Sequence, residues 1–423
     1  MKKYIIPILL LAFSFSACQK LLEIDQKGVI STDSFYQTDE DAESALVAAY
    51  EMAMLGIVRN NEYIYSPYNA ILTYPSDDVY AAGSNYGDND YLAALNEFRE
   101  DINNQCVSNM YKGFYKAIYG ANLVIDNFEY GASTVKDRCI SEARVIRAFS
   151  HMMLAILWGT PPIVDHVLTG ADRPGNSESQ EAVLRWAAAE CIDAAKHLDE
   201  RQSTGDKAGA AKITKGAAYA FAGKALMFAK DYSAAKTELK KVISSGKYAL
   251  VPGNRIGENF HIVGDGNEEK IFEFNQEYNS SIGLWSGRIQ RSTWMQVQLW
   301  NWRADRLGGT PTHLFGGGWG GMNPTGAFAE ALIANDGFDS YRRKAWIATY
   351  DEVLYEMPYV SDKDCPTRED KEKDPYRGII EPVGLYGHEG YFHLKLIASA
   401  SDIKEGMYSD TNFLIMRYAE VLL

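Results

Sequence analysis

The chain has 423 residues, of which 46% are hydrophobic, and a formal net charge of −14. This length is sufficient for one large domain or two and for a sizeable core. The acidic balance argues against nucleic acid as a partner, because nucleic-acid binding needs clustered Lys and Arg. The charge identifies no other partner. The aromatic content is more informative, with 27 Tyr, 17 Phe and 8 Trp.

The first 17 residues have the pattern of a secretory signal peptide. Lys2-Lys3 is followed by an apolar run over residues 4–15 and by two small residues. A membrane span needs about 20 apolar residues, so this run is too short to be one. Cys18 then occupies the lipidated position of a bacterial lipobox, with Phe15 where Leu is usual. We predict a signal peptide over residues 1–17, a lipid on Cys18 and a tether over 18–38. An ordinary cleavage site beside an unrelated cysteine is the alternative.

Residues 39–252 are predicted to form a helical region. Acidic residues at 39–41 favour a helix start, and apolar periodicity predicts three more helices before residue 200. These three cover Asn103–Phe128, Val135–Trp158 and Gln180–Leu198. Residues 63–91 lack this periodicity and carry seven tyrosines. A loop of that length is usually functional or disordered, and the tyrosines argue against disorder.

The stretch from Lys212 to Leu250 is predicted to be a helical hairpin. Five apolar positions recur at helical spacing in its first half (Ala218, Phe221, Ala222, Ala225 and Ala229). Four do so in its second half (Ala235, Leu239, Val242 and Ile243). Asp231 or Ser233 is the expected N-cap of the second helix, and Gly246 the expected left-handed residue at its end. This tetratricopeptide-like unit needs neighbours to cover its apolar face.

Residues 260–423 are predicted to be less regular. The alternation over 269–274 indicates a strand. Residues 278–325 are rich in Gly and Trp, and residues 323–335 favour a short helix with Pro324 in its first turn. Residues 363–373 form a mixed-charge run that we interpret as a solvated loop. The last seven residues have helical character without a cap, so we expect the sequence to be truncated.

The candidate catalytic and metal-binding motifs lack the spacing or the structural context that such sites require. His388 and His393 miss zinc-protease spacing by one residue, and Gly390 disfavours the helix that this site needs. The glycines at 316, 318 and 321 satisfy GxGxxG but are followed by Asn323-Pro324 instead of a helix start. Asp362 and Asp364 are interpreted as solvated rather than as calcium ligands. Neither a cofactor nor a metal is expected. The four cysteines of the mature chain after Cys18 are expected to be mostly small buried residues, with one disulfide left open; they are Cys106, Cys139, Cys191 and Cys365.

Taken together, these segments resemble the SusD/RagB family of nutrient-uptake outer-membrane lipoproteins. The residues that carry the resemblance are Cys18, Ser76-Asp77-Asp78, Tyr115 to Ile118 with Ala121-Asn122, Glu142-Ala143-Arg144 with Arg147-Ala148-Phe149, Trp158-Gly159 with Pro161-Pro162, the hairpin over 212–250 and Arg417 to Leu423. Each motif alone is weak, whereas their order and spacing along nearly the whole chain are specific. Tyr111 stands where the family often has Trp, and the family usually continues beyond the last of these motifs.

The resemblance implies a mainly α-helical, SusD-like fold with tetratricopeptide-like hairpins as scaffold and a loop-rich C-terminal half with a few short strands. It implies a lipid-anchored protein on the cell surface of the outer membrane that captures oligosaccharides without cleaving them. The implied partner is a SusC-like TonB-dependent transporter. Arg144, Arg147 and Trp158 are then expected to be structural. A secreted helical carbohydrate-active enzyme, or a scaffold lipoprotein that binds only protein, are the alternatives.

We predict that the sugar is held by aromatic side chains from the two loop regions, because flat rings pack on the C–H faces of sugars. The predicted ligand residues are Tyr80, Tyr86, Trp285, Trp300 and Trp319, with Asn85, Asp88 and Arg288 as polar partners. Five of the eight tryptophans lie within residues 285–319, and about half of them are expected to pack in the interior instead. The sequence does not specify which glycan is bound, or whether the nutrient is a glycan.

Overall fold

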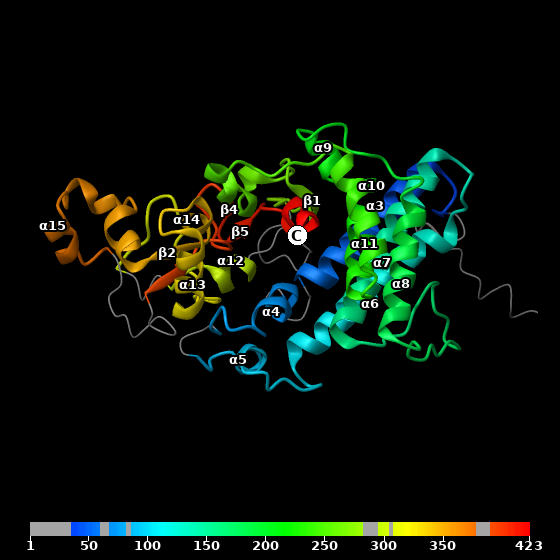
Figure 1. The fold of residues 1–423 in the computed structure, drawn as a ribbon, viewed down its shortest axis with the longest axis horizontal. Helices are drawn as coiled ribbons and strands as arrows, with labels where there is room; N and C mark the ends of the chain where they lie inside the picture. The colour runs from blue at the N-terminus through cyan, green and yellow to red at the C-terminus, as the bar shows by residue number, and fades with distance from the viewer. Residues whose placement is uncertain (1–34, 60–66, 82–85, 282–294, 304–307, 378–389) are drawn as a thin grey trace, which may run out of the picture.

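A computed structural model describes residues 35–59, 67–81, 86–281, 295–303, 308–377 and 390–423. Long helices pack side by side at one end of the elongated molecule, and short helices, short strands and loops form the other end (Figure 1). The prediction of a mainly helical fold with few strands is therefore confirmed. In the described ranges no helix combines the length and apolar character that a membrane crossing requires.

Six helices form the bundle. They are α3 (Asp39–Met54), α6 (Gln105–Asn127), α7 (Thr134–Trp158), α8 (Gln180–Ala194), α10 (Lys215–Phe228) and α11 (Tyr232–Ser244). Each begins where a side-chain oxygen accepts a hydrogen bond from a backbone N–H of the first turn. The capping residues are Thr38, Asn104, Ser133, Ser179, Thr214 and Asp231. Gly159 ends α7 with φ +80°, a backbone conformation that glycine adopts without a steric penalty.

The helical hairpin is present as α10 and α11. All five predicted apolar residues of its first helix are buried, which confirms that stripe. Asp231, and not Ser233, caps the second helix, and Gly246 has the predicted positive φ of +65°. Ile243 is the exception because its side chain is 40% exposed and lies outside the core. A Cβ atom on Gly223 would lie 2.5 Å from the Leu239 side chain, so glycine permits the close approach of the two helices.

A second close approach joins α6 to the π-helical segment η1 (Leu55–Arg59) that follows α3. A Cβ atom on Gly113 would lie 2.0 Å from the carbonyl oxygen of Gly56, and one on Gly56 would lie 2.3 Å from that of Gly113. Real Cβ atoms do not approach a backbone oxygen so closely. Glycine at both positions therefore sets how tightly this segment packs on α6.

The other end of the molecule consists of short elements. Its helices are α4 (Pro67–Thr73), α5 (Asp90–Asn96), α12 (Met295–Trp300), α13 (Gly326–Asp336), α14 (Tyr341–Trp346) and α15 (Arg368–Lys373). Its strands form three antiparallel pairs: β1 (Lys270–Phe274) with β6 (Phe413–Arg417), β2 (Ile347–Thr349) with β3 (Tyr391–His393), and β4 (Ile403–Glu405) with β5 (Tyr408–Ser409). The chain then enters α16 (Tyr418–Leu422), which packs against α11.

Several sequence-based expectations for this end are wrong. The long loop over 63–91 contains α4 and reaches α5, and the mixed-charge run ends in the helix α15. Thr325 caps α13, so Pro324 precedes the helix instead of occupying its first turn. The strand predicted over residues 269–274 is confirmed as β1, but it is buried on both faces, although its sequence alternates, because its charged side chains have partners inside the protein. Three of the cysteines in the described part are free and buried, whereas Cys365 is half-buried and also free.

Candidate functional site

Two segments that are far apart in the sequence meet at one surface. Val79 forms an isolated antiparallel bridge with Pro324. The Tyr80 N–H donates to the Asn323 carbonyl at 2.8 Å, and the Thr325 hydroxyl donates to the Asp77 carbonyl at 2.7 Å. Thr325 is also the N-cap of α13, so one residue both starts a helix and holds the opposite loop. We call the region formed by residues 76–80 and 319–325 the loop face; residues 320–324 are buried in it, whereas Asp77 and Asp78 are exposed and Tyr80, Trp319 and Thr325 are half-buried.

Asn96, the last residue of α5, fixes the first of these segments. Its amide nitrogen lies 2.9 Å from the Tyr74 and Val79 carbonyl oxygens and 3.3 Å from that of Ser76. Its amide oxygen accepts the Tyr86 hydroxyl at 2.9 Å. One side chain therefore satisfies the backbone of a turn that makes few regular hydrogen bonds. This arrangement is the reason that the loop has a defined shape.

A small aromatic core lies beneath the loop face. Trp300 and Tyr74 are completely buried in it, with ring centroids 5.9 Å apart. Tyr86 and Trp319 are half-buried and pack against the same cluster. The prediction that Trp300 contacts a sugar is therefore wrong, because its indole has no accessible face. It belongs to the half of the tryptophans that the sequence assigned to packing, as does the buried Trp302.

The other predicted site residues divide into two groups. Tyr80 is half-buried on the loop face, and Asp88 is exposed after the turn that contains Tyr86. Cys18, Asn85, Trp285 and Arg288 lie outside the described residues. The structure thus brings Tyr80, Tyr86 and Trp319 to one region, and their contact with a ligand stays a prediction.

A cavity of about 550 Å³ lies next to the loop face. Val79, Met322 and Pro324 form its wall on the loop side. The opposite lining includes Phe260, Trp346, His393, Lys395 and Arg417, from η2 (Gly253–Phe260), α14, β3 and β6 and the turn after β3. Its volume is in the range of pockets that bind small molecules. Among the described residues no group of three or more His, Cys, Asp or Glu side chains could hold a metal ion.

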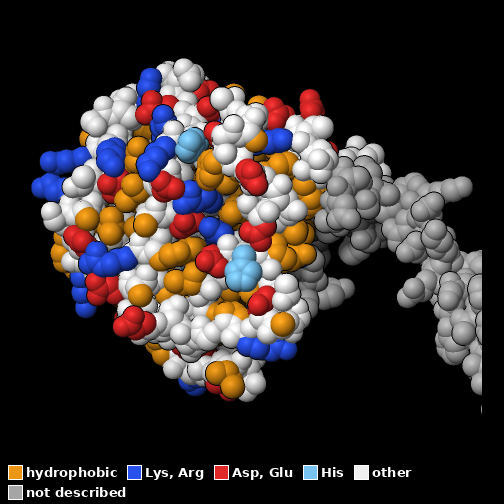
Figure 2. All heavy atoms as spheres, turned by 90° about the vertical axis from the view of Figure 1, so that its right-hand side faces the viewer, with side chains coloured by type: hydrophobic (Ala, Val, Ile, Leu, Met, Phe, Trp, Pro, Cys, Tyr) orange, Lys and Arg blue, Asp and Glu red, His pale blue; other side chains and the backbone are white. Residues whose placement is uncertain are grey.

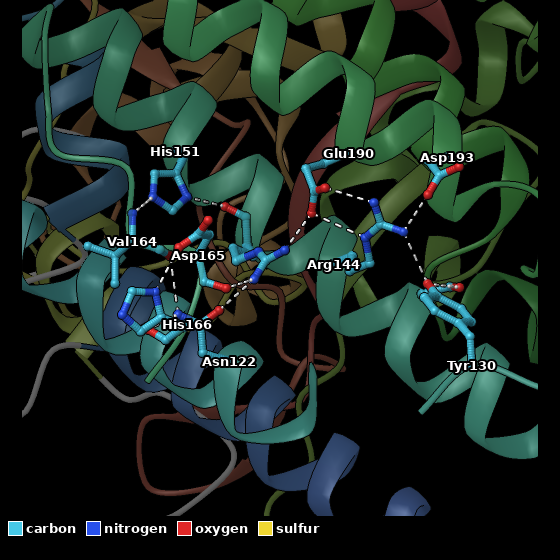
Figure 3. Close-up of polar contacts among 11 residues, drawn as sticks. Asn122, Tyr130, Arg144, His151, Val164, Asp165, His166, Glu190 and Asp193 are labelled. Atoms are coloured by element: carbon cyan, nitrogen blue, oxygen red, sulfur yellow. Dashed lines mark hydrogen bonds and ion pairs between the residues drawn. The ribbon is translucent and has the colours of Figure 1, made fainter. Parts of the chain in front are cut away.

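The motifs at 122, 144–147 and 158–162 have a structural role in the bundle, and Figure 3 shows the polar contacts of Asn122 and Arg144. The Asn122 amide donates to the carbonyls of Val164 and His166 at 3.1 and 2.8 Å. The buried Arg147 guanidinium donates to Asn122 Oδ1 at 2.8 Å and to the Asp165 carbonyl. These bonds fix the segment that follows α7 against α6. Trp158 packs edge-on against Tyr111 and Phe114, with centroid distances of 5.4 and 6.3 Å.

His151 on α7 completes this attachment. Its Nε2 accepts the Val164 N–H at 3.0 Å, so its Nδ1 carries the proton that is donated to the Arg147 carbonyl at 2.9 Å. Burial lowers the pKa of His151 to about 4, and the ring is neutral at physiological pH. A buried histidine with both nitrogens bonded to backbone is part of the scaffold and is not available for acid–base chemistry.

Arg144 and Glu190 connect α7 to α8 (Figure 3). Arg144 pairs with Glu190 at 2.7 Å and with Asp193 at 2.6 Å, and Arg147 pairs with Glu190 at 2.6 Å. Burial would raise the pKa of Glu190, but hydrogen bonds from Arg144 and both guanidinium charges bring it below its usual value. The expectation that Arg144, Arg147 and Trp158 are structural is confirmed. On the outer face of the bundle, acidic, basic and apolar side chains are interspersed (Figure 2).

The sequence did not single out Asn96 or Lys395. Asn96 is one amide at the end of a seven-residue helix, and no motif marks a side chain that bonds to loop carbonyls. Lys395 follows a three-residue strand and differs from the other lysines only through its three-dimensional surroundings. In both cases the informative signal is the environment, which spacing along the chain does not encode.

The chain is similar to SusD-like proteins in sequence. The SusD-like family described as "Starch-binding associating with outer membrane" matches residues 54–226. SusD-like protein P25 of Formosa agariphila is 26% identical over 67% of this chain, and SusD-like protein P2 of that organism is 23% identical over the whole chain. The match spans 76% of P2 but only 51% of P25 and 53% of a third relative, P38, so the chain spans about half the length of two of these relatives.

Solved structures share the fold. Surface glycan-binding protein A from Bacteroides thetaiotaomicron, in complex with laminarihexaose, superposes with a TM-score of 0.71 over 91% of this chain and 77% of its own, at 19% identity. A laminarin-binding SusD-like protein gives 0.68 over 91% and 79% at 18% identity. The fold is thus that of the SusD-like proteins. The matching family model, the curated relatives and the solved structures therefore agree that this chain is similar to the SusD-like proteins.

Proposed function

We propose that this protein binds an oligosaccharide on the loop face, does not cleave it, and delivers it to a SusC-like TonB-dependent transporter. The proposal rests on the contact between residues 76–80 and residues 319–325, which meet above one aromatic core. Tyr80, Tyr86 and Trp319 are half-buried in this region. Binding residues are commonly presented by loops on a rigid scaffold. The SusD-like fold, shared with a laminarin-binding protein and with a protein in complex with laminarihexaose, supports a glycan as the ligand.

The chemistry of the loop face determines the expected strength of binding. Sugar rings have apolar C–H faces that pack on Tyr and Trp, which lose little rotamer freedom when they do so. Water competes for sugar hydroxyls, so each hydrogen bond adds only about 1 kcal/mol. Packing on aromatic rings should therefore dominate, and dissociation constants on the order of micromolar to millimolar are expected.

Replacement of Trp319 by Ala tests the location of the site. We expect affinity for laminarihexaose or maltohexaose, measured by isothermal titration calorimetry, to fall by about tenfold or more, a loss of about 1.4 kcal/mol. Tyr232→Ala removes a 66% exposed aromatic ring from α11 and should leave affinity unchanged. If Trp319→Ala lowers the melting temperature but keeps the affinity, Trp319 is a core residue and the site lies elsewhere.

The membrane anchor and the transporter need separate tests. A lipid on Cys18 would hold the protein on the outer membrane, and Cys18→Ala should release it and abolish labelling by a fatty-acid analogue. Continued labelling of that variant would contradict the anchor. A large TonB-dependent barrel should co-purify in mild detergent. Release of reducing ends by the purified, partner-free protein would show that it is an enzyme instead.

A further inference from the structure

The cavity next to the loop face contains an ammonium group that has no ionic partner among the residues the structure describes. Lys395 lines the cavity and remains exposed to solvent there. Its Nζ lies 4.7 Å from the ring centroid of Trp346 and 5.2 Å from that of Phe260. Within the described part of the chain, no carboxylate lies within 4.0 Å of this nitrogen and no acceptor forms a hydrogen bond with it. Aromatic faces attract a cation but leave its hydrogen-bond donors free.

The other charged groups of the lining do not neutralise Lys395. Arg417 is paired with Glu269 at 2.7 Å, and Glu420 is paired with Lys224 at 2.7 Å. Asp78, at the loop face, is not within ion-pair distance of Lys395. His393 is neutral at physiological pH because burial lowers its pKa to about 4.

The protonation state of Lys395 follows from the same surroundings. Partial desolvation by the surrounding cavity walls and, second, the Arg417 charge lower the pKa of Lys395 to about 8, so the group is still mostly protonated at pH 7. The cavity therefore presents one positive charge that no residue in the described ranges neutralises.

A ligand that completes this site must supply one negative charge beside a flat, partly apolar body. A hexuronate has both, because its carboxylate would pair with the ammonium while its ring packs on Trp346 or Phe260. We propose that the cavity binds the carboxylate of an acidic sugar, a hexuronate unit of an oligosaccharide, with Lys395 as its ion-pair partner. This inference rests on the proposed function for the statement that the ligand is a glycan. It adds that the cavity prefers glycans that carry a negative charge.

The net negative charge of the protein opposes the binding of an acidic sugar. At −14, the chain as a whole repels anions, so binding of a polyanionic sugar has to come from a local cationic site. Lys395→Met keeps the length of the apolar stem and removes only the charge. Lys240→Met makes the same change on the exposed surface of α11, where no ion pair involves the side chain, and is the matched control. Lys395→Arg restores the charge.

The experiment is calorimetric titration of the full-length mature protein and these three variants with tri-galacturonate, an alginate trimer and neutral laminarihexaose. We expect Lys395→Met to weaken binding of the acidic trimers by tenfold or more, while laminarihexaose affinity is unchanged. Lys240→Met should match the wild type, and Lys395→Arg should recover most of the affinity for acidic trimers. Thermal melts establish that each variant is folded.

Three results would count against the inference in different ways. Equal affinity of Lys395→Met and wild type for both acidic trimers would overturn it. Wild-type binding of laminarihexaose without binding of either acidic trimer would also overturn it, and would leave the proposed function intact. Failure to bind any of the three sugars would contradict both the proposed function and this inference.

Discussion

Charged side chains in the helical bundle and beside the cavity have different surroundings. In the bundle, Arg147 is 5% exposed and binds Asn122, the Asp165 carbonyl and Glu190. Beside the loop face, Lys395 has only aromatic faces around its charge. A buried charge is costly unless it is paired. The difference therefore separates groups that hold the fold together from a group that is open to a ligand.

The comparison also shows how an irregular segment is given a shape. The segment after α7 is held by side chains from α6 and α7, and residues 74–79 are held by Asn96. In both cases one amide satisfies backbone carbonyls that no helix or strand would pair. The first segment is held from two long helices, whereas the second depends on one residue at the end of a short helix. The loop face should be the easier of the two to disrupt.

The largest effect is expected for Arg147→Met, which breaks the network of the bundle. Asn122 and the Asp165 carbonyl lose a buried partner, and Glu190 keeps only Arg144. Removal of one member of a buried ionic network should lower the free energy of unfolding by about 3–5 kcal/mol. Chemical denaturation measures this loss.

The matched control for this prediction is Arg185→Met on α8. Arg185 also pairs with two acids, Glu181 at 2.7 Å and Asp231 at 2.9 Å, but its side chain is 46% exposed. Exposed pairs contribute about 0–1 kcal/mol, so this variant should be close to the wild type. Equal losses in the two variants would mean that burial is not what makes the Arg147 network stabilising.

A smaller effect is expected for Asn96→Ala, which releases residues 74–79. The carbonyls that Asn96 now satisfies would have to find water, at a cost of about 1–3 kcal/mol. Because the loop face loses its defined shape, affinity for laminarihexaose should fall even where the protein is fully folded. Asn127→Ala removes an exposed amide that bonds only to the Leu123 carbonyl within α6, and should change neither quantity. Unchanged affinity in Asn96→Ala would mean that sugar binding does not depend on the conformation of residues 74–79.

The smallest effect concerns Asp265, near the β1–β6 pair. Burial and, second, the charge of Glu273 raise its pKa to about 7, against 3.8 for the free side chain. Between these values the folded state holds a proton that the unfolded state has released, so stability decreases as pH rises from about 4 to 7. Asp265→Asn should be more stable than the wild type at pH 8 by on the order of 1–2 kcal/mol, with little difference at pH 4.

Urea denaturation of the wild type and Asp265→Asn at pH 4, 6 and 8 measures this dependence. Other carboxylates change the absolute stability of both proteins, so the informative quantity is the difference between them at each pH. Asp364→Asn alters a 73% exposed carboxylate and should give a difference that does not vary with pH. A constant difference for Asp265→Asn as well would contradict the raised pKa.

Much of the bundle could be predicted from the sequence because its signals are local. Apolar spacing located α6, α7 and α8 to within a few residues, and Asp231 and Gly246 marked the ends of α11. The motifs at 144–147 and 158–162 also carried the resemblance to the SusD-like proteins. Short elements were predicted less well, since α4 and α15 have too few turns to produce a period, and tertiary contacts decide whether they form.

The sequence by itself determined the helical class, the hairpin and the resemblance to SusD-like proteins, because helical periodicity, capping residues and motif order are properties of neighbouring positions. That aromatic residues at 80–86 and 285–319 contact the ligand stays a prediction. Only the tertiary structure decided that Trp300 is core while Trp319 is half-buried, that Thr325 joins the two loops, and that the ammonium group of Lys395 lies over the ring of Trp346. Burial and charge pairing depend on which distant segments meet, and the order of residues along one segment does not contain that information.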